Sequence, residues 1–296
     1  MTTSPPGSFD KRDGTIWFDG QLVEWSSARI HVLTHGLHYA SCVYEGERAY
    51  SGQVFKINEH SSRLLNSARI LDMEVLYDLE RIATATYSVL RLNNISDGYV
   101  RPVVWRGSEK ISTSARSSSV HFAIACWVWP AYFDPKSSMN GLRLCMGAWR
   151  RPPPECSPFL AKASSHYAIA TLSKHQAEAA GYDDALLLDW RGYVAEATSA
   201  NIFFVDGNTL HTPRPDCFLD GITRQTIVQL ASMRGYEIIE RTILPDELNT
   251  FSEAFLTGTA CEVAPIREID GCSFKPGKIC EQMMEDYAKL VRLNYA

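Results

Sequence analysis

The stretch Phe159-Leu-Ala-Lys-Ala-Ser-Ser-His-Tyr167 decides the prediction for this chain, because it places Lys162 between small and apolar neighbours. It follows the run Pro152-Pro153-Pro154 and precedes a helical pattern. We therefore expect Lys162 at a strand end or in a loop, facing a cleft. Burial disfavours the ammonium form, and a lysine placed in this way can act as a nucleophilic amine. Most lysines are solvated surface charges, so the hypothesis needs support from other segments.

The composition is typical of an ordinary soluble globular protein. The 296 residues are 45% hydrophobic and 21% charged, with a net charge of −5 and no basic stripe of the kind that nucleic-acid binders carry. No window approaches the roughly 18 apolar residues that would span a bilayer. The first residues, Met1 to Ser8, lack the apolar core of a signal peptide. We therefore expect a cytoplasmic protein that contacts neither membrane nor nucleic acid.

Cysteine and histidine spacing gives no support for a metal site. The eight cysteines show no CxxC spacing, and the one histidine cluster, His31, His35 and His38, has no HExxH pattern beside it. In a chain of this size such cysteines are typical of buried apolar residues or free thiols. We expect no metal and no disulfide framework.

Periodicity predicts two parts joined by a linker. The first part, residues 1–129, has alternating segments and two helical segments; the expected strands cover 16–24, 43–50, 99–105 and 119–129, and the expected helices 58–71 and 79–92. Asn58 is the expected cap of the first of these helices. Residues 130–140 turn to Pro, Lys, Ser and Asn without periodicity, so we place the linker there and a second domain at 141–296.

The second part alternates between strands and helices. The expected strands are 142–149, 185–189, 202–205, 238–241 and 254–256, and the expected helices are 166–180, a segment ending near 233, and one starting near 276. The last helix carries Ile279, Met283, Tyr287 and Leu290 on one face. The chain shows no internal repeat.

Three further segments of this part could complete the site around Lys162. Gly221-Ile222-Thr223 stands at a helix start, where free N–H groups favour a phosphate, and Thr257-Gly-Thr-Ala260 follows a strand and offers a second set. Glu196 lies between two apolar strands, where a charge needs a partner. A helix cap, a strand-ending turn and a structural ion pair would each explain one of these features without function. Together, an amine, two anion-binding turns and a buried carboxylate are the groups that pyridoxal phosphate requires.

These segments resemble the fold-type IV pyridoxal-phosphate enzymes, and among them the branched-chain amino-acid aminotransferases. The resemblance covers nearly the whole chain, and the motifs that carry it are Lys162 with Tyr167, Glu196 with Asn201, Leu219 to Arg224, Thr257 to Ala260, His38-Tyr39, Tyr44 to Arg48, Glu59-His60 with Arg63, and Tyr99 to Pro102. It implies an α/β (α+β two-domain) fold, with a smaller N-terminal α/β domain and a larger C-terminal pseudo-barrel domain that binds pyridoxal 5'-phosphate. It also implies a homodimer or larger homo-oligomer.

The resemblance implies a role for each matching residue. Lys162 would form the Schiff base and move the proton, Tyr167 would bind the phenolic oxygen of the cofactor, and Glu196 would pair with its pyridine nitrogen. The phosphate would be held by Arg63, Ile222, Thr223 and Thr259. The substrate would be bound by Tyr39, Tyr44, Arg48, Tyr99, Arg101, Trp129, Tyr132 and the backbone of Thr259 and Ala260.

The implied reaction moves an amino group between an amino acid, a branched-chain or other hydrophobic L-amino acid, and 2-oxoglutarate. Three departures leave the side-chain specificity open: His166 stands where Asn is common, Glu47 where an apolar residue is frequent, and residues 106–112 are not the usual glycine-rich loop. A D-amino-acid or (R)-amine transaminase and an aminodeoxychorismate lyase are alternatives with the same cofactor. A phosphate-binding protein without chemistry is the alternative of another class, but it would need neither Lys162 nor Glu196.

Overall fold

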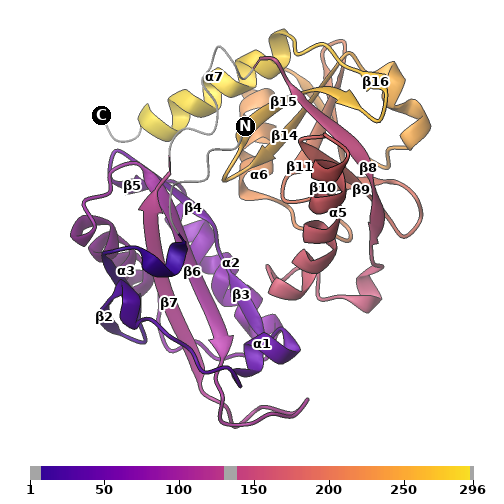
Figure 1. Ribbon diagram of the computed structural model, residues 1–296. Coiled ribbons are helices and arrows are strands. Elements are labelled where there is room, and N and C mark those ends of the chain that lie inside the picture. The colour runs from indigo at the N-terminus through magenta and orange to yellow at the C-terminus, as the bar shows by residue number, and fades with distance from the viewer. Residues whose placement is uncertain (1–7, 130–138, 294–296) are drawn as a thin grey trace. The chain divides into compact units, whose positions relative to one another are not determined.

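Two separate β-sheets organise the chain (Figure 1). The computed structural model describes residues 8–129 and 139–293. It divides into two compact units, residues 1–130 and residues 131–296, which we call unit 1 and unit 2. The predicted linker at 130–140 lies mostly outside the described residues, and the domain boundaries stay a prediction.

Unit 1 is built on a seven-stranded sheet in the order β2-β1-β7-β6-β4-β5, with β3 also paired to β6. All of its strand pairs are antiparallel. The strands are β1 (Thr15–Phe18), β2 (Gln21–Glu24), β3 (Cys42–Tyr44), β4 (Glu47–Tyr50), β5 (Gln53–Val54), β6 (Gly98–Arg106) and β7 (Val120–Val128). The helices are α1 (His35–Tyr39), α2 (Ile57–Ile70) and α3 (Leu79–Leu92).

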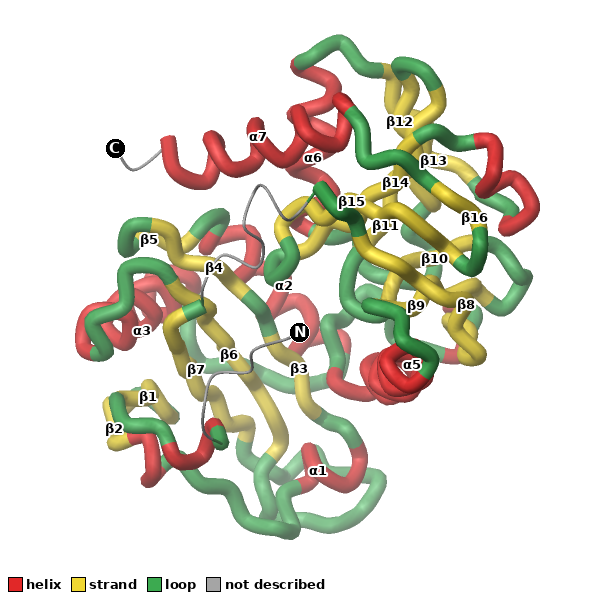
Figure 2. Tube along the Cα trace, turned by 45° about the horizontal axis from the view of Figure 1, so that its top comes forward, coloured by secondary structure: helices red, strands yellow, loops and turns green. Residues whose placement is uncertain are grey.

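Helices α2 and α3 lie together against this sheet, as Figure 2 shows. Each helix buries small and branched side chains at helical spacing: α2 buries Leu64 and Ala68, and α3 buries Ile82 and Val89. The expected cap of α2 was wrong. Asn58 lies inside the helix, and the residue at the cap position is Lys56, which has the left-handed backbone conformation and makes no side-chain cap.

Unit 2 is built on a nine-stranded sheet in the order β10-β9-β8-β15-β14-β11-β12-β13, with β16 paired to β15. The strands are β8 (Leu142–Arg151), β9 (Asp184–Asp189), β10 (Val194–Ala197), β11 (Asn201–Asp206), β12 (Thr209–Pro213), β13 (Glu237–Arg241), β14 (Glu253–Gly258), β15 (Glu262–Ile269) and β16 (Cys272–Ser273). Sequence patterns missed β10, β12 and β15.

The sheet of unit 2 curls round so that one edge meets the other. Strand β10, at one end of the order, contacts β11 and β12 near the opposite end. Val194 N–H donates to the carbonyl of Ile243, just after β13, at 2.9 Å. The inner surface carries an apolar cluster, in which Leu186, Phe204 and Ile266 are fully buried. The mixed α/β fold with a larger, barrel-like second part is therefore confirmed.

Three helices cover the outside of this curved sheet. Helix α5 (Tyr167–Ala179) packs on β8 and β9, and α6 (Ile222–Met233) and α7 (Lys278–Leu293) pack on β14 and on one another. Of the residues expected on one face of the last helix, Ile279, Met283 and Tyr287 are buried. Among the described residues, no helix is long and apolar enough to cross a membrane. The cytoplasmic location stays a prediction.

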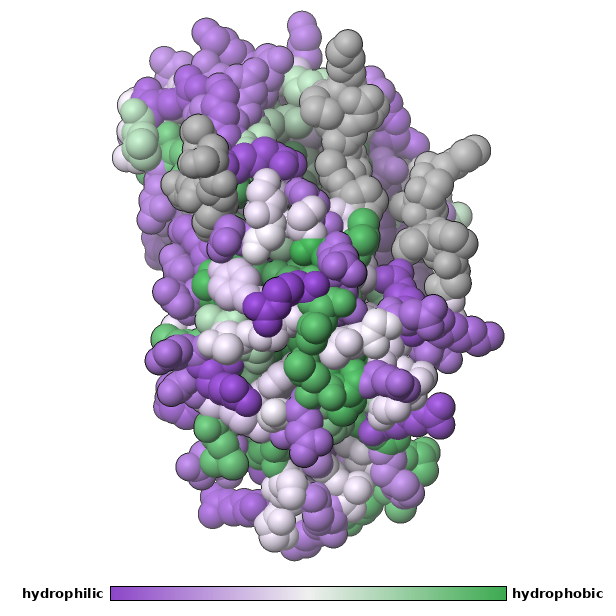
Figure 3. Space-filling model, turned by 90° about the vertical axis from the view of Figure 1, so that its left-hand side faces the viewer, coloured by the Kyte–Doolittle hydropathy of each residue, from purple (hydrophilic) through white to green (hydrophobic). Residues whose placement is uncertain are grey.

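None of the eight cysteines forms a disulfide bond in the described part of the chain, and four of them are buried. Burial raises the pKa of Cys126 to about 11, so this thiol stays protonated at neutral pH. The face drawn in Figure 3 has mostly hydrophilic areas, in purple, with smaller apolar areas, in green, among them. One group of exposed apolar side chains comes from a single segment, residues 30–39; it consists of Ile30, Val32, Leu33, Leu37 and Tyr39.

Candidate active site

Lys162 lies in the loop before α5, not on a helix face, as its neighbours predicted. Ala161 and Ala163 are fully buried on either side of it, so the backbone is fixed here while the lysine side chain is half-buried. Its Nζ donates to the hydroxyl of Tyr167, the first residue of α5, at 2.7 Å. The two residues that the resemblance paired therefore meet in the structure.

Glu196 is a buried carboxyl group on strand β10, a strand that the sequence had not predicted. Its Oε1 pairs with Nη2 of Arg151 at 2.9 Å. Burial raises the pKa of Glu196, while the charges of Arg151 and Lys162 oppose this shift. The carboxyl group therefore lies close enough to Lys162 to sense its charge, and it has the partner that a buried charge requires.

Asn201 connects Glu196 to the start of helix α6. Its Nδ2 donates to the carbonyl of Leu219 at 3.0 Å and reaches Oε2 of Glu196 at 3.4 Å, while its Oδ1 accepts from Gly221 N–H at 3.1 Å. A methyl group on Gly221 would meet that Oδ1 at 2.3 Å, so a larger residue at this position would force the amide of Asn201 to move. The carboxylate and the first of the two predicted anion-binding turns thus belong to one hydrogen-bonded group.

Helix α6 begins without a side-chain cap. The cap residue is Gly221, the first turn has no acidic residue, and Ile222 and Thr223 are buried. The first N–H groups of a helix have no partner within the helix, and the helix dipole favours an anion there. This end of α6 therefore has the properties of the predicted phosphate site.

The second predicted turn follows strand β14. Thr259 and Ala260 are half-buried in the turn between β14 and β15, and Thr257 pairs across the sheet with Asn201. Because side chains alternate along a strand, Glu196, Asn201 and Thr257 all point away from the apolar cluster that contains their neighbours Ala197, Ile202 and Leu256. These three polar residues therefore share the outer face of this sheet.

In unit 1, the predicted substrate residues of β3, β4 and β6 share one face of the sheet. Arg48 pairs with Tyr99 across the strands, Tyr44 pairs with Val103, and Arg101 lies between these positions on the same face. The guanidinium carbon of Arg101 lies 4.5 Å from the centre of the Tyr44 ring, and Nη2 of Arg101 donates to the hydroxyl of Tyr99 at 3.3 Å. Two cations and two phenols thus lie side by side.

Aromatic rings extend this face. The ring of Tyr99 lies 5.1 Å from that of Trp127 and 5.3 Å from that of Trp129, the latter a predicted substrate residue. Trp127 was missed, although its alternation with Trp129 in the sequence could have indicated it. Gly46 leaves room for Tyr99, since a methyl group there would lie 1.9 Å from the tyrosine hydroxyl. A face with two arginines among aromatic rings is suited to a carboxylate with an apolar side chain.

The remaining predicted residues of this unit lie elsewhere. Tyr39 ends helix α1, and its ring stacks on His35 at 4.5 Å. Arg63, on α2, makes a two-point ion pair with the buried Glu45 at 2.7 and 2.8 Å, and Glu45 also bonds His60 at 2.7 Å. Although burial opposes the charge, Arg63 and His60 hold the pKa of Glu45 well below its usual range. Tyr132 lies outside the described residues.

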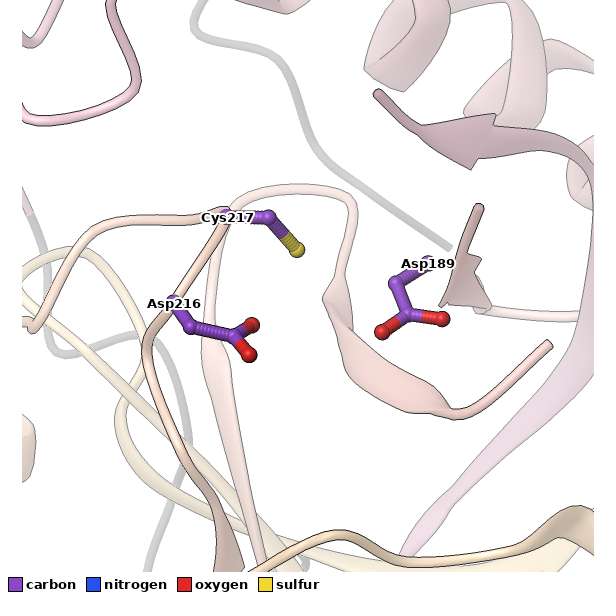
Figure 4. Close-up of side chains that lie close together, drawn as sticks. All are labelled: Asp189, Asp216 and Cys217. Carbon is purple, nitrogen blue, oxygen red and sulfur yellow. The ribbon is translucent and has the colours of Figure 1, made fainter. Parts of the chain in front are cut away.

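One cluster in unit 2 has the composition of a metal site. Asp189, Asp216 and Cys217 bring their side-chain ligand atoms within 4.8 Å of one another (Figure 4). Arg191 lies between the two carboxylates, with its Nη2 at 2.6 Å from Asp189 and 2.7 Å from Asp216. Burial raises the pKa of Cys217 to about 12. The carboxylates of this cluster are therefore already engaged in ion pairs with Arg191, and the thiol of Cys217 is protonated at neutral pH.

Comparison with known proteins identifies the family. The model of the family described as "Amino-transferase class IV" matches residues 42–269. The chain belongs to this family. A relative named "Probable branched-chain-amino-acid aminotransferase", from Rickettsia felis, is 43% identical over 281 residues, which cover 94% of this chain and 96% of the relative. The "Branched-chain-amino-acid aminotransferase" of Pseudomonas aeruginosa is 39% identical and covers 96% of this chain and 95% of its own.

A solved structure agrees with the class IV assignment. It is the T.th. branched-chain amino acid aminotransferase complexed with N-(5'-phosphopyridoxyl)-L-glutamate; it shares 34% sequence identity, has a TM-score of 0.90, and covers 95% of this chain and 94% of its own. This class IV aminotransferase thus uses pyridoxal 5'-phosphate, which confirms the cofactor predicted from the sequence. The residues present fit that group, since the uncapped start of α6 suits its phosphate and the buried Glu196 suits a protonated ring nitrogen.

Proposed function

We propose that this aminotransferase moves the amino group of a branched-chain or other hydrophobic L-amino acid to 2-oxoglutarate, with Lys162 as its Schiff-base lysine. The observation that carries the proposal is the contact between Lys162 Nζ and the hydroxyl of Tyr167 at 2.7 Å, in a unit where Glu196 is buried and paired. The names of the relatives from Rickettsia felis and Pseudomonas aeruginosa support the branched-chain donor. The L-glutamate adduct in the solved T.th. structure supports 2-oxoglutarate as acceptor.

The chain's own residues each supply one part of this chemistry. When bound, the cofactor provides a ring that accepts electron density from the substrate carbon that loses its proton. The Nζ of Lys162 would take that proton and return it at the neighbouring carbon, and the Tyr167 hydroxyl orients this amine through the bond described above. Glu196 would hold a proton on the ring nitrogen. The start of α6 and Thr259 would bind the phosphate, as would Arg63.

The face around Tyr99 supports an L-amino acid as donor. Arg48 and Arg101 offer guanidinium groups to a carboxylate, and Tyr44, Tyr99 and Trp129 offer apolar surface to its side chain. Ala260 would contribute its backbone. A D-amino acid carries the same carboxylate and an (R)-amine need not carry one, so the rates with different donors separate these alternatives.

Two experiments test the proposal. Steady-state rates with L-leucine, D-alanine and an (R)-amine, each with 2-oxoglutarate, should be highest for L-leucine; turnover of only the D-amino acid or the amine would overturn the donor assignment. Borohydride treatment of the cofactor-loaded protein should add the mass of the reduced cofactor to the peptide that contains Lys162. Lys162→Ala should lose this adduct and at least about 10⁴-fold in transfer rate. An adduct on another lysine would contradict the role of Lys162.

We also propose that the protein is a homodimer or a larger homo-oligomer. The exposed apolar residues of segment 30–39 support this, since contiguous apolar side chains on a surface mark interaction sites.

A further inference from the structure

Arg151 is a buried arginine that links three elements of unit 2. It is the last residue of strand β8 and is 7% exposed. Its Nη2 lies 2.9 Å from Oε1 of Glu196 on β10, and its Nη1 donates at 2.9 Å to the carbonyl of His166, directly before helix α5. One guanidinium group therefore holds both the carboxyl group and the turn that leads into Tyr167.

We infer that Arg151 is a positioning residue that keeps Glu196 ionised, so that the proton shared with the cofactor stays on the pyridine nitrogen. The inference rests on the proposed function and deepens it, because it makes Arg151 responsible, through Glu196, for the protonation of the cofactor's pyridine nitrogen.

The energetic argument starts from the burial of Glu196. A buried carboxylate without compensation takes up a proton instead. A neutral carboxylic acid could no longer hold a proton on a ring nitrogen, and a neutral ring would accept electron density less well. A guanidinium group does not deprotonate in proteins, so Arg151 provides a fixed positive charge at 2.9 Å.

The other partner of Glu196 cannot supply this charge. Asn201 is neutral and lies 3.4 Å from Oε2, so it orients the carboxyl group without compensating it. Lys162 is charged but is the reacting amine, and its charge changes during the proposed reaction. Arg151 is the contact of Glu196 that has both a short distance and a permanent charge.

The bond from Arg151 to His166 extends its effect to Tyr167. The imidazole of His166 lies 2.9 Å from the hydroxyl of Ser157, and burial together with Arg151 lowers the pKa of His166 to about 4. His166 is therefore neutral at pH 7 and adds no second positive charge beside the guanidinium. Arg151 thus holds the backbone of His166, the residue before Tyr167, and the neutral imidazole of His166 does not compete with Arg151 for the carboxylate of Glu196.

The test is a double-mutant cycle on the full-length protein, with pyridoxal 5'-phosphate as the probe. Arg151→Met keeps much of the side-chain volume but removes the charge, and we expect it to weaken cofactor binding and slow transfer by roughly 10- to 100-fold, as loss of a positioning partner typically does. In the Glu196→Gln background the same change should alter the dissociation constant less than about threefold. Equal effects in both backgrounds would mean that Arg151 does not act through the charge of Glu196, and would overturn the inference.

Two further variants separate charge from shape. Arg151→Lys retains the charge and is expected within about threefold of the wild type; a loss as large as that of Arg151→Met would contradict the inference. Arg151→Gln also removes the charge, and it replaces Arg151→Met in the cycle if the latter does not fold, as judged from the thermal midpoint without cofactor. Arg150→Met removes the exposed neighbouring arginine and should leave affinity and rate unchanged. A wild type that neither binds the cofactor nor forms the Lys162 adduct would instead refute the proposed function.

Discussion

Glu47 is a buried ionisable residue inside the sheet of unit 1. It is fully buried on β4, and its two carboxyl oxygens have no hydrogen-bond partner among the described residues. Burial raises the pKa of Glu47 well above its ordinary value, and the nearby Glu45 adds to this. Since Arg48 follows it on the strand, Glu47 points to the face opposite the arginines and aromatic rings.

The raised pKa of Glu47 predicts a pH-dependent cost in stability. The folded state keeps this proton at pH values where the unfolded chain has released it, so stability falls as pH rises above about 4.5. Glu47→Gln should match the wild type at about pH 4 and exceed it in urea midpoint at about pH 8. Urea unfolding at both pH values measures this. A variant that is equally stable or less stable at the higher pH would show that Glu47 is ionised and paired.

Glu45 provides the matched control, because it is also a buried carboxyl group in this unit but its pKa is shifted in the opposite direction from that of Glu47. Its pKa is lowered by Arg63 and His60 despite burial, so its contribution to stability is present at neutral pH and is lost as pH falls. Glu45→Gln should destabilise the protein by roughly 3 kcal/mol at neutral pH, since it leaves Arg63 without its two-point partner.

At the scale of single residues, the sequence was informative where motifs are local. Lys162 and Tyr167 lie five positions apart, and the structure joins them directly. Trp127, which pairs with Tyr99 on the adjacent strand, was missed, although its alternation with Trp129 is a local pattern that could have indicated it. Arg151 was missed because its importance depends on Glu196, which is 45 positions away in the chain and is brought near by the fold. No local pattern records that contact.

The start of helix α6 is the element on which cofactor binding depends most. Gly221→Ala would place a methyl group 2.3 Å from Oδ1 of Asn201, although the backbone of residue 221 suits any residue. The amide must then move, and its bond to Gly221 N–H is lost. We expect the dissociation constant for pyridoxal 5'-phosphate to rise roughly tenfold, which corresponds to about 1.4 kcal/mol. Titration of the apo-protein measures it, and an unchanged constant would mean that Asn201 does not shape this turn.

The failure to predict strands β15 and β10 from the sequence has physical reasons. Strand β15 contains Pro265, which cannot donate a ladder hydrogen bond and therefore argued against a strand. The proline is tolerated because β8 pairs with β15 only from Ile266 onward, so no bond to β8 is lost. Strand β10 is short and has an irregular register between Val194 and Glu196, which hides its alternation. Helices α3 and α5 were predicted well because their apolar faces repeat over several turns.

At the scale of the whole molecule, the exposed apolar segment makes the proposed association testable. Val32 and Leu37 are 69% and 61% exposed. If the segment lies in an interface between copies, Leu37→Asp should shift the protein toward the monomer in sedimentation velocity by burying a charge there. Leu76→Asp is a matched control, since Leu76 is 85% exposed on another segment. A wild-type monomer, or equal behaviour of the two variants, would contradict the proposal.

The position of β8 in the larger sheet constrains how the chain reaches its native state. This strand opens unit 2, yet it lies between β9 and β15, and its register pairs Leu142 with Ile266. During synthesis β8 can pair with β9 early, but its second neighbour, β15, becomes available only when nearly the whole chain has left the ribosome. Shorter nascent chains would expose Leu144 and the apolar residues around it, so chaperone binding should persist until residue 269 emerges and then decline.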